Sequence, residues 1–290
     1  MFCKIGNKLL VLYNVLAGYC IKWKTDIFGP GKLYHLERKN EGENIIVSLT
    51  SYGRRVQKTV YYTLVSLLKQ TLPANRIILW LSADNWSDET LPKRLKKLKE
   101  YGVEYGFCKD LRSYTKLIPS LKAAPKDLIV TVDDDMIYSR ILLQTLYKEH
   151  KKYPDCICCM EALMPAHSDK SSFLPYRNWK EAKHSDTKED RVLFPLGVGG
   201  VLYPPGALHK DVLLEDCFTE LCPAADDIWF WAMARQQGTA CRLVPEKTKK
   251  YSFDALYQFF HKNSALTHDN RKRNMNDVQL YAVLKKYPVL

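Results

Sequence analysis

The fold is decided by the stretch Leu128-Ile129-Val130-Thr131-Val132-Asp133-Asp134-Asp135, an apolar run that ends in three acidic residues. Such an uninterrupted run of leucine and β-branched residues is typical of a strand that is buried on both faces of a parallel sheet. Ligands of open α/β sheets bind beyond the carboxyl ends of the strands. The sequence therefore predicts a ligand site at Asp133–Asp135.

Three earlier runs have the same character, and helical patterns lie between them. The runs are Ile45–Thr50, Arg76–Ser82 and residues 103–107. Residues 56–69 and 91–101 space their apolar side chains as helices do, and we predict a further helix at 114–123. This alternation predicts an α/β fold with a mostly parallel sheet flanked by helices, in a single main domain.

The residues that follow these strands are candidates for binding, because parallel strands bring their carboxyl ends to one edge. After the first strand, the candidate nucleotide contacts are Thr50, Ser51, Tyr52 and Arg54. A tyrosine can stack on a base and an arginine can contact a phosphate. The next residue, Arg55, is either a further contact or a solvated charge at the start of a helix.

Two later polar residues are candidates of the same kind. Asp110 follows the third strand, where it either binds a ribose or base edge or lies in a surface turn. Lys116 is a candidate contact to a diphosphate.

The acidic triplet predicts a metal site. Three adjacent carboxylates repel one another unless a cation compensates them. In an extended turn, Asp133 and Asp135 project to the same side, so both can reach one hard cation, Mn²⁺ or Mg²⁺. The alternative is a solvated turn, but the position at the sheet edge favours the metal.

A second acidic pair, Asp226-Asp227, opens a predicted helix at Asp226–Gln237, which Gly238 ends. Acids at this position either stabilise the helix start or, in an apolar niche, act as a general base. The aromatic residues that follow the pair are expected to form a wall behind it.

Two weaker signals lie elsewhere in the second half. Gly199 and Gly200 belong to a glycine-rich strand predicted at 197–203, where they either admit a ligand close to the backbone or mark a bulge. His261 and His268 are each either a further metal ligand or a surface histidine. The polar segment 168–191 is expected to be a long loop.

The composition bounds the partners and the compartment. The net charge of +12 indicates an anionic partner, but the basic residues follow no aromatic–basic pattern, so nucleic acid is not expected. The nine cysteines do not form the two C-x-x-C pairs of a zinc site, and they are typical of reduced thiols in a cytoplasmic protein.

The two ends of the chain are expected to differ from the main domain. Residues 1–44 form an extension in which the apolar stretch 9–21 is too short to span a bilayer. We expect it to be a helix that packs on the domain or lies on the inner face of the membrane, followed by a linker at 22–44. The main domain covers residues 45–250, and in the tail, 251–290, a helix at 277–286 is expected to pack on the active site.

The strand that ends in the acidic triplet, the later Gly199-Gly200 strand and the Asp226-Asp227 helix together resemble GT-A glycosyltransferases, and more narrowly the inverting, family-2-like bacterial enzymes. The resemblance covers roughly residues 45 to 240, although the loop at 50–55 lacks the prolines and the acidic residue usual in that family.

The resemblance implies roles for individual residues. Asp133 and Asp135 match the D-x-D acids that bind the metal and the sugar nucleotide, and Asp134 between them is a candidate contact to the donor nucleotide. Asp227 stands at the position of the catalytic base, with Asp226 as its competitor. The remaining matches, to regions that hold the nucleoside or flank the donor sugar and acceptor, are Thr50, Tyr52, Asp110, Gly199 and Gly200.

The function implied is metal-dependent, inverting transfer of a sugar from a nucleotide-sugar donor, expected to be UDP-linked, to a hydroxyl of a glycan or lipid-linked glycan. One alternative is a metal-dependent sugar nucleotidyltransferase, which usually has a glycine-rich, basic loop after its first strand. Another is a non-catalytic protein that binds anionic ligands.

Overall fold

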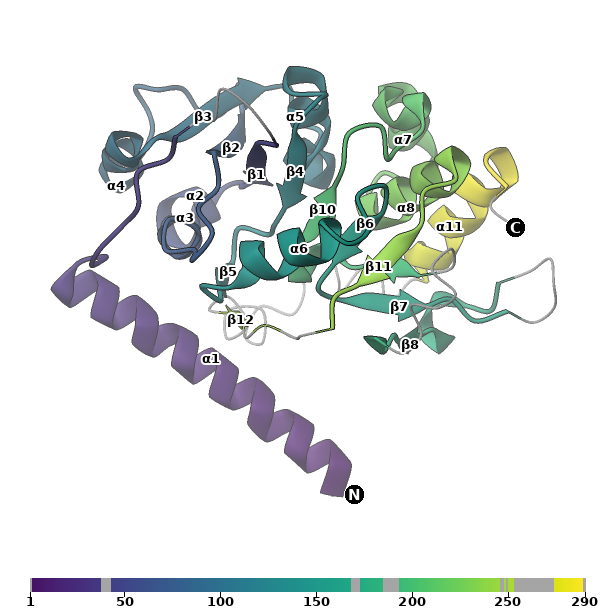
Figure 1. The fold of residues 1–290 in the computed structure, drawn as a ribbon, viewed down its shortest axis with the longest axis horizontal. Coiled ribbons are helices and arrows are strands. Elements are labelled where there is room, and N and C mark those ends of the chain that lie inside the picture. The colour runs from purple at the N-terminus through teal and green to yellow at the C-terminus, as the bar shows by residue number, and fades with distance from the viewer. Residues whose placement is uncertain are drawn as a thin grey trace.

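The fold is built around one seven-stranded sheet (Figure 1), in a computed structural model that describes residues 2–37, 43–167, 173–184, 193–245, 248, 250–252 and 274–288. The strand order is β11-β6-β10-β4-β1-β2-β3. These strands are β1 (Ile45–Thr50), β2 (Arg76–Ser82), β3 (Val103–Cys108), β4 (Leu128–Thr131), β6 (Ile157–Cys159), β10 (Val201–Tyr203) and β11 (Cys241–Leu243). Only β10 runs antiparallel to its neighbours within this sheet. The predicted mostly parallel α/β fold is confirmed.

Helices cover both faces of the sheet, and a separate apolar core lies under each set. One face packs against α2 (Arg54–Lys58), α3 (Val60–Leu67), α4 (Lys93–Leu98) and α6 (Leu142–His150). The other packs against α5 (Ile118–Ala123), α7 (Glu215–Leu221), α8 (Asp226–Gln237) and α11 (Met275–Lys286). In β4, Val130 points into the first core and Ile129 into the second, as the alternation of side chains along a strand requires.

Two small sheets accompany the main one. The first pairs β5 (Met136–Tyr138) with β12 (Lys250–Ser252), and the second contains β7 (Ala162–Met164), β8 (Lys180–Glu181) and β9 (Phe194–Pro195). None of these strands was predicted from the sequence, and neither were α6, α7, β6 and β11. Because a 3₁₀ turn lies at Tyr176–Asn178 and β8 at 180–181, the expectation of a long loop at 168–191 is wrong for the part of it that the structure describes.

Several predicted elements have different bounds. The pattern at 56–69 forms two helices, and the one at 114–123 begins with a 3₁₀ turn at Arg112–Lys116. The predicted strand at 197–203 is a 3₁₀ turn, Gly197–Gly199, followed by β10. At the N-terminus, α1 (Phe2–Phe28) is one continuous helix, so the predicted linker at 22–44 begins too early.

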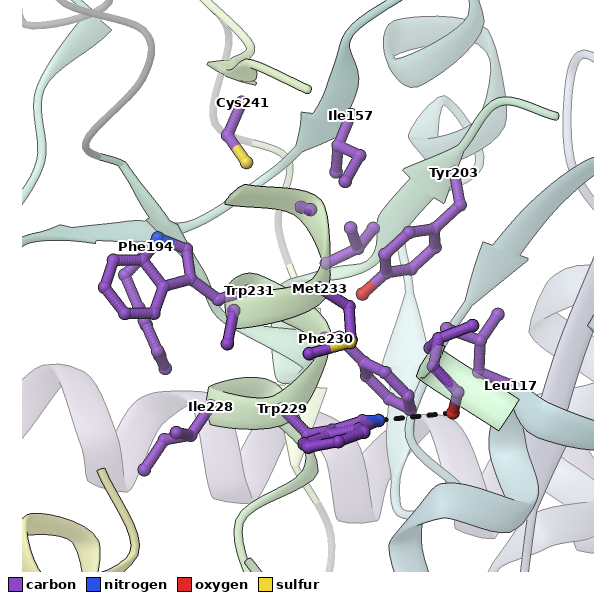
Figure 2. Packing of buried hydrophobic residues seen from close by; sticks show 14 of the residues in the cluster. Leu117, Ile157, Phe194, Tyr203, Ile228, Trp229, Phe230, Trp231, Met233 and Cys241 are labelled. Atoms are coloured by element: carbon purple, nitrogen blue, oxygen red, sulfur yellow. Dashed lines mark hydrogen bonds between the residues drawn. The ribbon is translucent and has the colours of Figure 1, made fainter. Parts of the chain in front are cut away.

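The helix α8 is buried on all sides, which fixes its position against the sheet. Figure 2 shows its side chains pointing in several directions into the core. The ring of Phe230 lies 6.2 Å from that of Tyr203, while Trp231 lies 5.5 Å from Phe194. The indole of Trp229 donates a hydrogen bond to the Val212 carbonyl at 3.2 Å. These aromatic residues are therefore core, and they do not form the wall of a ligand site that the sequence suggested.

A chain of buried hydrogen bonds ties the segment around residue 116 to the centre of the sheet. The Trp80 indole donates to the Ser120 hydroxyl at 2.8 Å, and the Ser120 and Ser48 hydroxyls are 2.7 Å apart. Ser48 in turn donates to the backbone carbonyl of Lys116 at 2.6 Å. Since Ser48 and Ser120 are fully buried, water does not replace these bonds if one is removed.

The variant Ser48→Ala is expected to lower the free energy of unfolding by about 1–3 kcal/mol, because it leaves the Lys116 carbonyl without this buried donor. Urea denaturation measures the loss. The control is Ser87→Ala, which removes an exposed hydroxyl and is expected to change stability by less than about 0.5 kcal/mol. Equal stabilities of the two variants would contradict the structural role of Ser48.

Candidate functional site

A cavity of about 890 Å³ lies at the carboxyl ends of the parallel strands. Residues that follow β1, β2, β3 and β4 all line it, which is the arrangement expected at this edge. The start of α8 and Asn276 of α11 complete its wall. The candidate residues that line it are Thr50, Ser51, Tyr52, Asp110, Lys116, Asp133, Asp134, Asp135, Asp226 and Asp227.

Lys116 is the central cation of the site. Its ammonium group lies 2.8 Å from Asp226, 3.6 Å from Asp133 and 4.0 Å from Asp227. Burial alone would lower the pKa of Lys116, but the three carboxylates together raise it well above the ordinary value. The side chain is therefore held as a buried ammonium that joins the acidic triplet to the acidic pair.

Arg55 compensates the other two acids of the triplet. Its guanidinium contacts Asp134 at 2.8 Å and Asp135 at 3.2 Å. Asp134 also accepts a hydrogen bond from the Ser51 hydroxyl at 2.5 Å, and its side chain is only 6% exposed. Asp134 is thus turned into the protein, whereas 32% of the Asp133 side chain is exposed.

Asp226 and Asp227 lie in the first turn of α8, but their environments differ. Asp226 is 11% exposed and forms the short ion pair with Lys116, whereas Asp227 is 31% exposed and lies at the longer distance. Withdrawal of Asp227 from bulk solvent raises its pKa to about 7, although Lys116 acts in the opposite direction. A carboxylate with this pKa can accept a proton near neutral pH.

Gly197 is the glycine that the site requires. A Cβ atom at this position would lie 2.7 Å from the Lys116 ammonium and 2.9 Å from a carboxylate oxygen of Asp227. The Gly197 amide donates a hydrogen bond to Asp227 at 3.3 Å. A side chain at residue 197 would therefore displace one of these two groups.

Some predicted site residues are not brought to the cavity. Gly199 and Gly200 pack instead against Met160, Glu161 and Leu142, so their role is close packing. Arg54 is exposed at the start of α2 and is not part of the cavity wall. His261 and His268 lie outside the described residues.

Several cavity residues were not among the sequence candidates. They include Phe194 and Asn276, and no role was predicted from the sequence for Gly197, which lies beside Lys116 and Asp227. Arg55 carried a signal, since it lies in the segment after β1, but the sequence does not tell it from Arg54. Tyr176 and Asn276 reach the cavity through tertiary contacts, among them the hydrogen bond from the Tyr176 amide to Asp277 at 2.6 Å. No local sequence pattern indicates such contacts.

The donor set of the cavity suits a metal that is shared with a phosphate ligand. In the part of the chain that the structure describes, no three acidic, histidine or cysteine side chains are grouped to hold a metal by themselves. However, six aspartates line the cavity against three basic side chains, Arg55, Arg112 and Lys116. Mg²⁺ commonly uses one or two carboxylates and completes its shell with water and phosphate oxygens. Asp133 and Asp135 carry oxygen ligands of this kind, and each also forms an ion pair in this structure, Asp133 with Lys116 and Asp135 with Arg55.

Comparison with known proteins returned solved structures only. No protein-family model and no curated protein matches the sequence. The solved structures include S. aureus TarS 1-349 in complex with UDP, at 16% identity and a TM-score of 0.48, over 72% of this chain and 60% of that chain. The same TarS segment with UDP-GlcNAc matches at 16% identity and 0.47, over 72% and 58%.

A 4-diphosphocytidyl-2C-methyl-D-erythritol synthase also matches, at 11% identity and a TM-score of 0.45, over 77% of this chain and all of that chain. The chain spans less than two thirds of the length of the TarS chain in each of the two complexes. These similarities concern the fold alone and do not indicate which ligands this chain binds. The sheet itself, seven-stranded, mostly parallel and flanked by helices, has the Rossmann-like arrangement predicted from the sequence.

The variant Lys116→Met is expected to lose about 3–5 kcal/mol of stability at pH 8, because it leaves the surrounding carboxylates without their cation. The pKa values of these carboxylates would rise in the folded variant, so the folded variant would bind more protons than its unfolded chain. The loss should consequently be smaller at pH 5. Urea denaturation at both pH values measures it.

The matched control for this experiment is Lys122→Met, which removes an exposed lysine of α5. We expect little change from it at either pH. A loss at Lys116 that is the same at pH 5 and pH 8 would contradict the assigned electrostatic role.

Proposed function

We propose that this protein is a glycosyltransferase that moves a sugar from a nucleotide-sugar donor to a hydroxyl of an acceptor glycan. The single observation that carries the proposal is the pairing of Asp227, with its pKa near 7, with the acidic triplet across Lys116 in one cavity. Asp227 suits removal of a proton from the acceptor and the acidic triplet suits binding of a metal–diphosphate, and metal-dependent sugar transfer uses both.

Asp227 is the proposed base, and Asp226 is assigned to structure. Asp226 is held in the short ion pair with Lys116, whereas the more exposed Asp227 is available to a substrate. A carboxylate oxygen of Asp227 takes the proton of the acceptor hydroxyl. The hydroxyl oxygen then forms its bond to the anomeric carbon as the bond from that carbon to the diphosphate breaks. Attack from the side opposite the diphosphate inverts the configuration.

Asp133 and Asp135 would hold the divalent ion together with the diphosphate oxygens. When bound, Mn²⁺ or Mg²⁺ offsets the negative charge that develops on the departing diphosphate. Arg55 and Ser51 keep Asp134 and Asp135 in place from the protein side. This arrangement fixes the triplet before any ligand binds, which lowers the cost of ordering it.

The nucleoside is proposed to lie at the end of the cavity formed by the loops after β1, β2 and β3. There Tyr52 is 53% exposed, and the Arg55 guanidinium lies 5.2 Å from its ring centre. Asp110 accepts a hydrogen bond from the Arg112 amide at 2.7 Å, which shapes the loop after β3. A ring beside a cation can stack on a base near the phosphates. UDP-linked sugars are the donors to test first.

The variant Asp227→Asn is expected to lower the rate of transfer at least about a hundredfold, because it removes the proton acceptor. The rate of the unmodified protein should rise with pH through about 7 as Asp227 loses its proton. Release of nucleoside diphosphate in the presence of acceptor measures both. If Asp226→Asn abolishes the pH dependence while Asp227→Asn leaves it intact, the two roles are exchanged.

Removal of divalent metal by EDTA is expected to abolish transfer, and added Mn²⁺ or Mg²⁺ to restore it. Asp133→Asn should weaken the stabilisation that nucleotide diphosphate and metal together give in a thermal-shift assay. The control is Asp88→Asn, an exposed acid outside the cavity. Undiminished activity after metal removal would contradict the role given to Asp133 and Asp135.

The same assays separate the two alternatives. A sugar nucleotidyltransferase would release pyrophosphate from a nucleoside triphosphate and a sugar phosphate. However, the loop at 50–55 contains one glycine, at residue 53, and does not form a glycine-rich phosphate cradle. A non-catalytic binding protein would bind anionic ligands without any turnover.

A further inference from the structure

The helix α1 carries a continuous apolar stripe on its outer side. The stripe consists of Tyr13, Leu16, Tyr19, Trp23 and Ile27, all of them exposed. Their spacing of three and four residues places them along one face of the helix. Trp23 has 63% of its surface exposed, which is unusual for so large an apolar side chain.

The opposite side of α1 is fastened to the domain. Val15 is buried, and Ile21 packs against Tyr62 and Ile137. Asp26 accepts hydrogen bonds from the Tyr62 hydroxyl at 2.5 Å and from Arg94 at 2.7 Å. Figure 1 shows α1 as one straight helix along the edge of the domain, beside β12. The stripe therefore faces away from the domain while the helix is docked.

Basic residues lie near the C-terminal end of α1. The first 32 residues contain five lysines and one acid. The contact between Asp26 and Arg94 joins the end of α1 to α4. Five exposed basic residues lie in α4 or directly after it: Lys93, Arg94, Lys96, Lys97 and Lys99. The whole chain carries a net charge of +12. Charge of this sign attracts anionic lipid headgroups.

We propose that the apolar stripe of α1 docks on an anionic bilayer, with the helix lying in the plane of the interface. Among the described residues, no helix is long and apolar enough to cross a membrane. Three of the five stripe residues are Tyr or Trp, which favour the boundary between lipid and water. A helix-pairing seam is instead built mainly from Leu, Ile and Val. This proposal is independent of the chemistry in the cavity.

Sedimentation of the full chain with lipid vesicles tests the proposal. We expect binding to mixed phosphatidylglycerol–phosphatidylcholine vesicles and much weaker binding to phosphatidylcholine alone. The double variant Trp23→Ser/Ile27→Ser should bind the anionic vesicles about tenfold more weakly or worse, because it removes buried apolar area at the interface. Lys93→Gln/Lys97→Gln should weaken binding mainly at low salt.

The matched control is Leu214→Ser/Val278→Ser, which changes two exposed apolar residues outside the stripe. Urea denaturation verifies that every variant is folded. Equal binding by the stripe variant and the control would overturn the proposal, and so would a full chain that binds neither kind of vesicle. A dimer in light scattering that the stripe variant converts to monomers, without vesicle binding, would assign the stripe to a second copy instead.

Discussion

The structure depends on one buried ammonium group. Removing the lysine charge from water is costly, and three carboxylates offset that cost only if they are held close together. Two parts of the chain that are nearly a hundred residues apart supply them, Asp133 after β4 and the Asp226-Asp227 pair at the start of α8. The ion pairs at Lys116 therefore join the first half of the domain to the second, at the point where substrates are proposed to react.

The rest of the core serves to keep this junction in place. Ser48 ties the backbone of Lys116 to β1, and the aromatic residues of α8 lock that helix against the sheet. Gly197 leaves the space that the lysine and Asp227 occupy. The polar site is thus specified by apolar packing around it, because side chains on a rigid element are positioned more precisely than those on a loop.

The sequence predicted the features that depend on local pattern. The buried runs of β1 to β4, the edge at which they end and the two acidic groups are all readable from residue types and spacing. The predictions that differ depend on contacts between distant residues. Arg55, and not Arg54, contacts the triplet because it lies on the side of the short helix α2 that faces these acids. Gly197, and not Gly199, is the glycine at the site because it lies against Lys116. The short strand β6 pairs with β10 and β11, and its three residues are too few to form a recognisable sequence pattern.

Two neighbouring aspartates on one helix have different surroundings here, and the reason is angular. Successive residues of an α-helix are about 100° apart around its axis, so Asp226 lies 2.8 Å from the lysine, while Asp227 lies 4.0 Å from it and is more exposed to the cavity. Rotation of α8 by one residue would exchange a structural carboxylate for a proton acceptor. The bulky side chains around α8 thus set its rotation as well as its depth, and substitutions in the core far from the cavity can alter the acid–base properties of the protein without touching a polar atom.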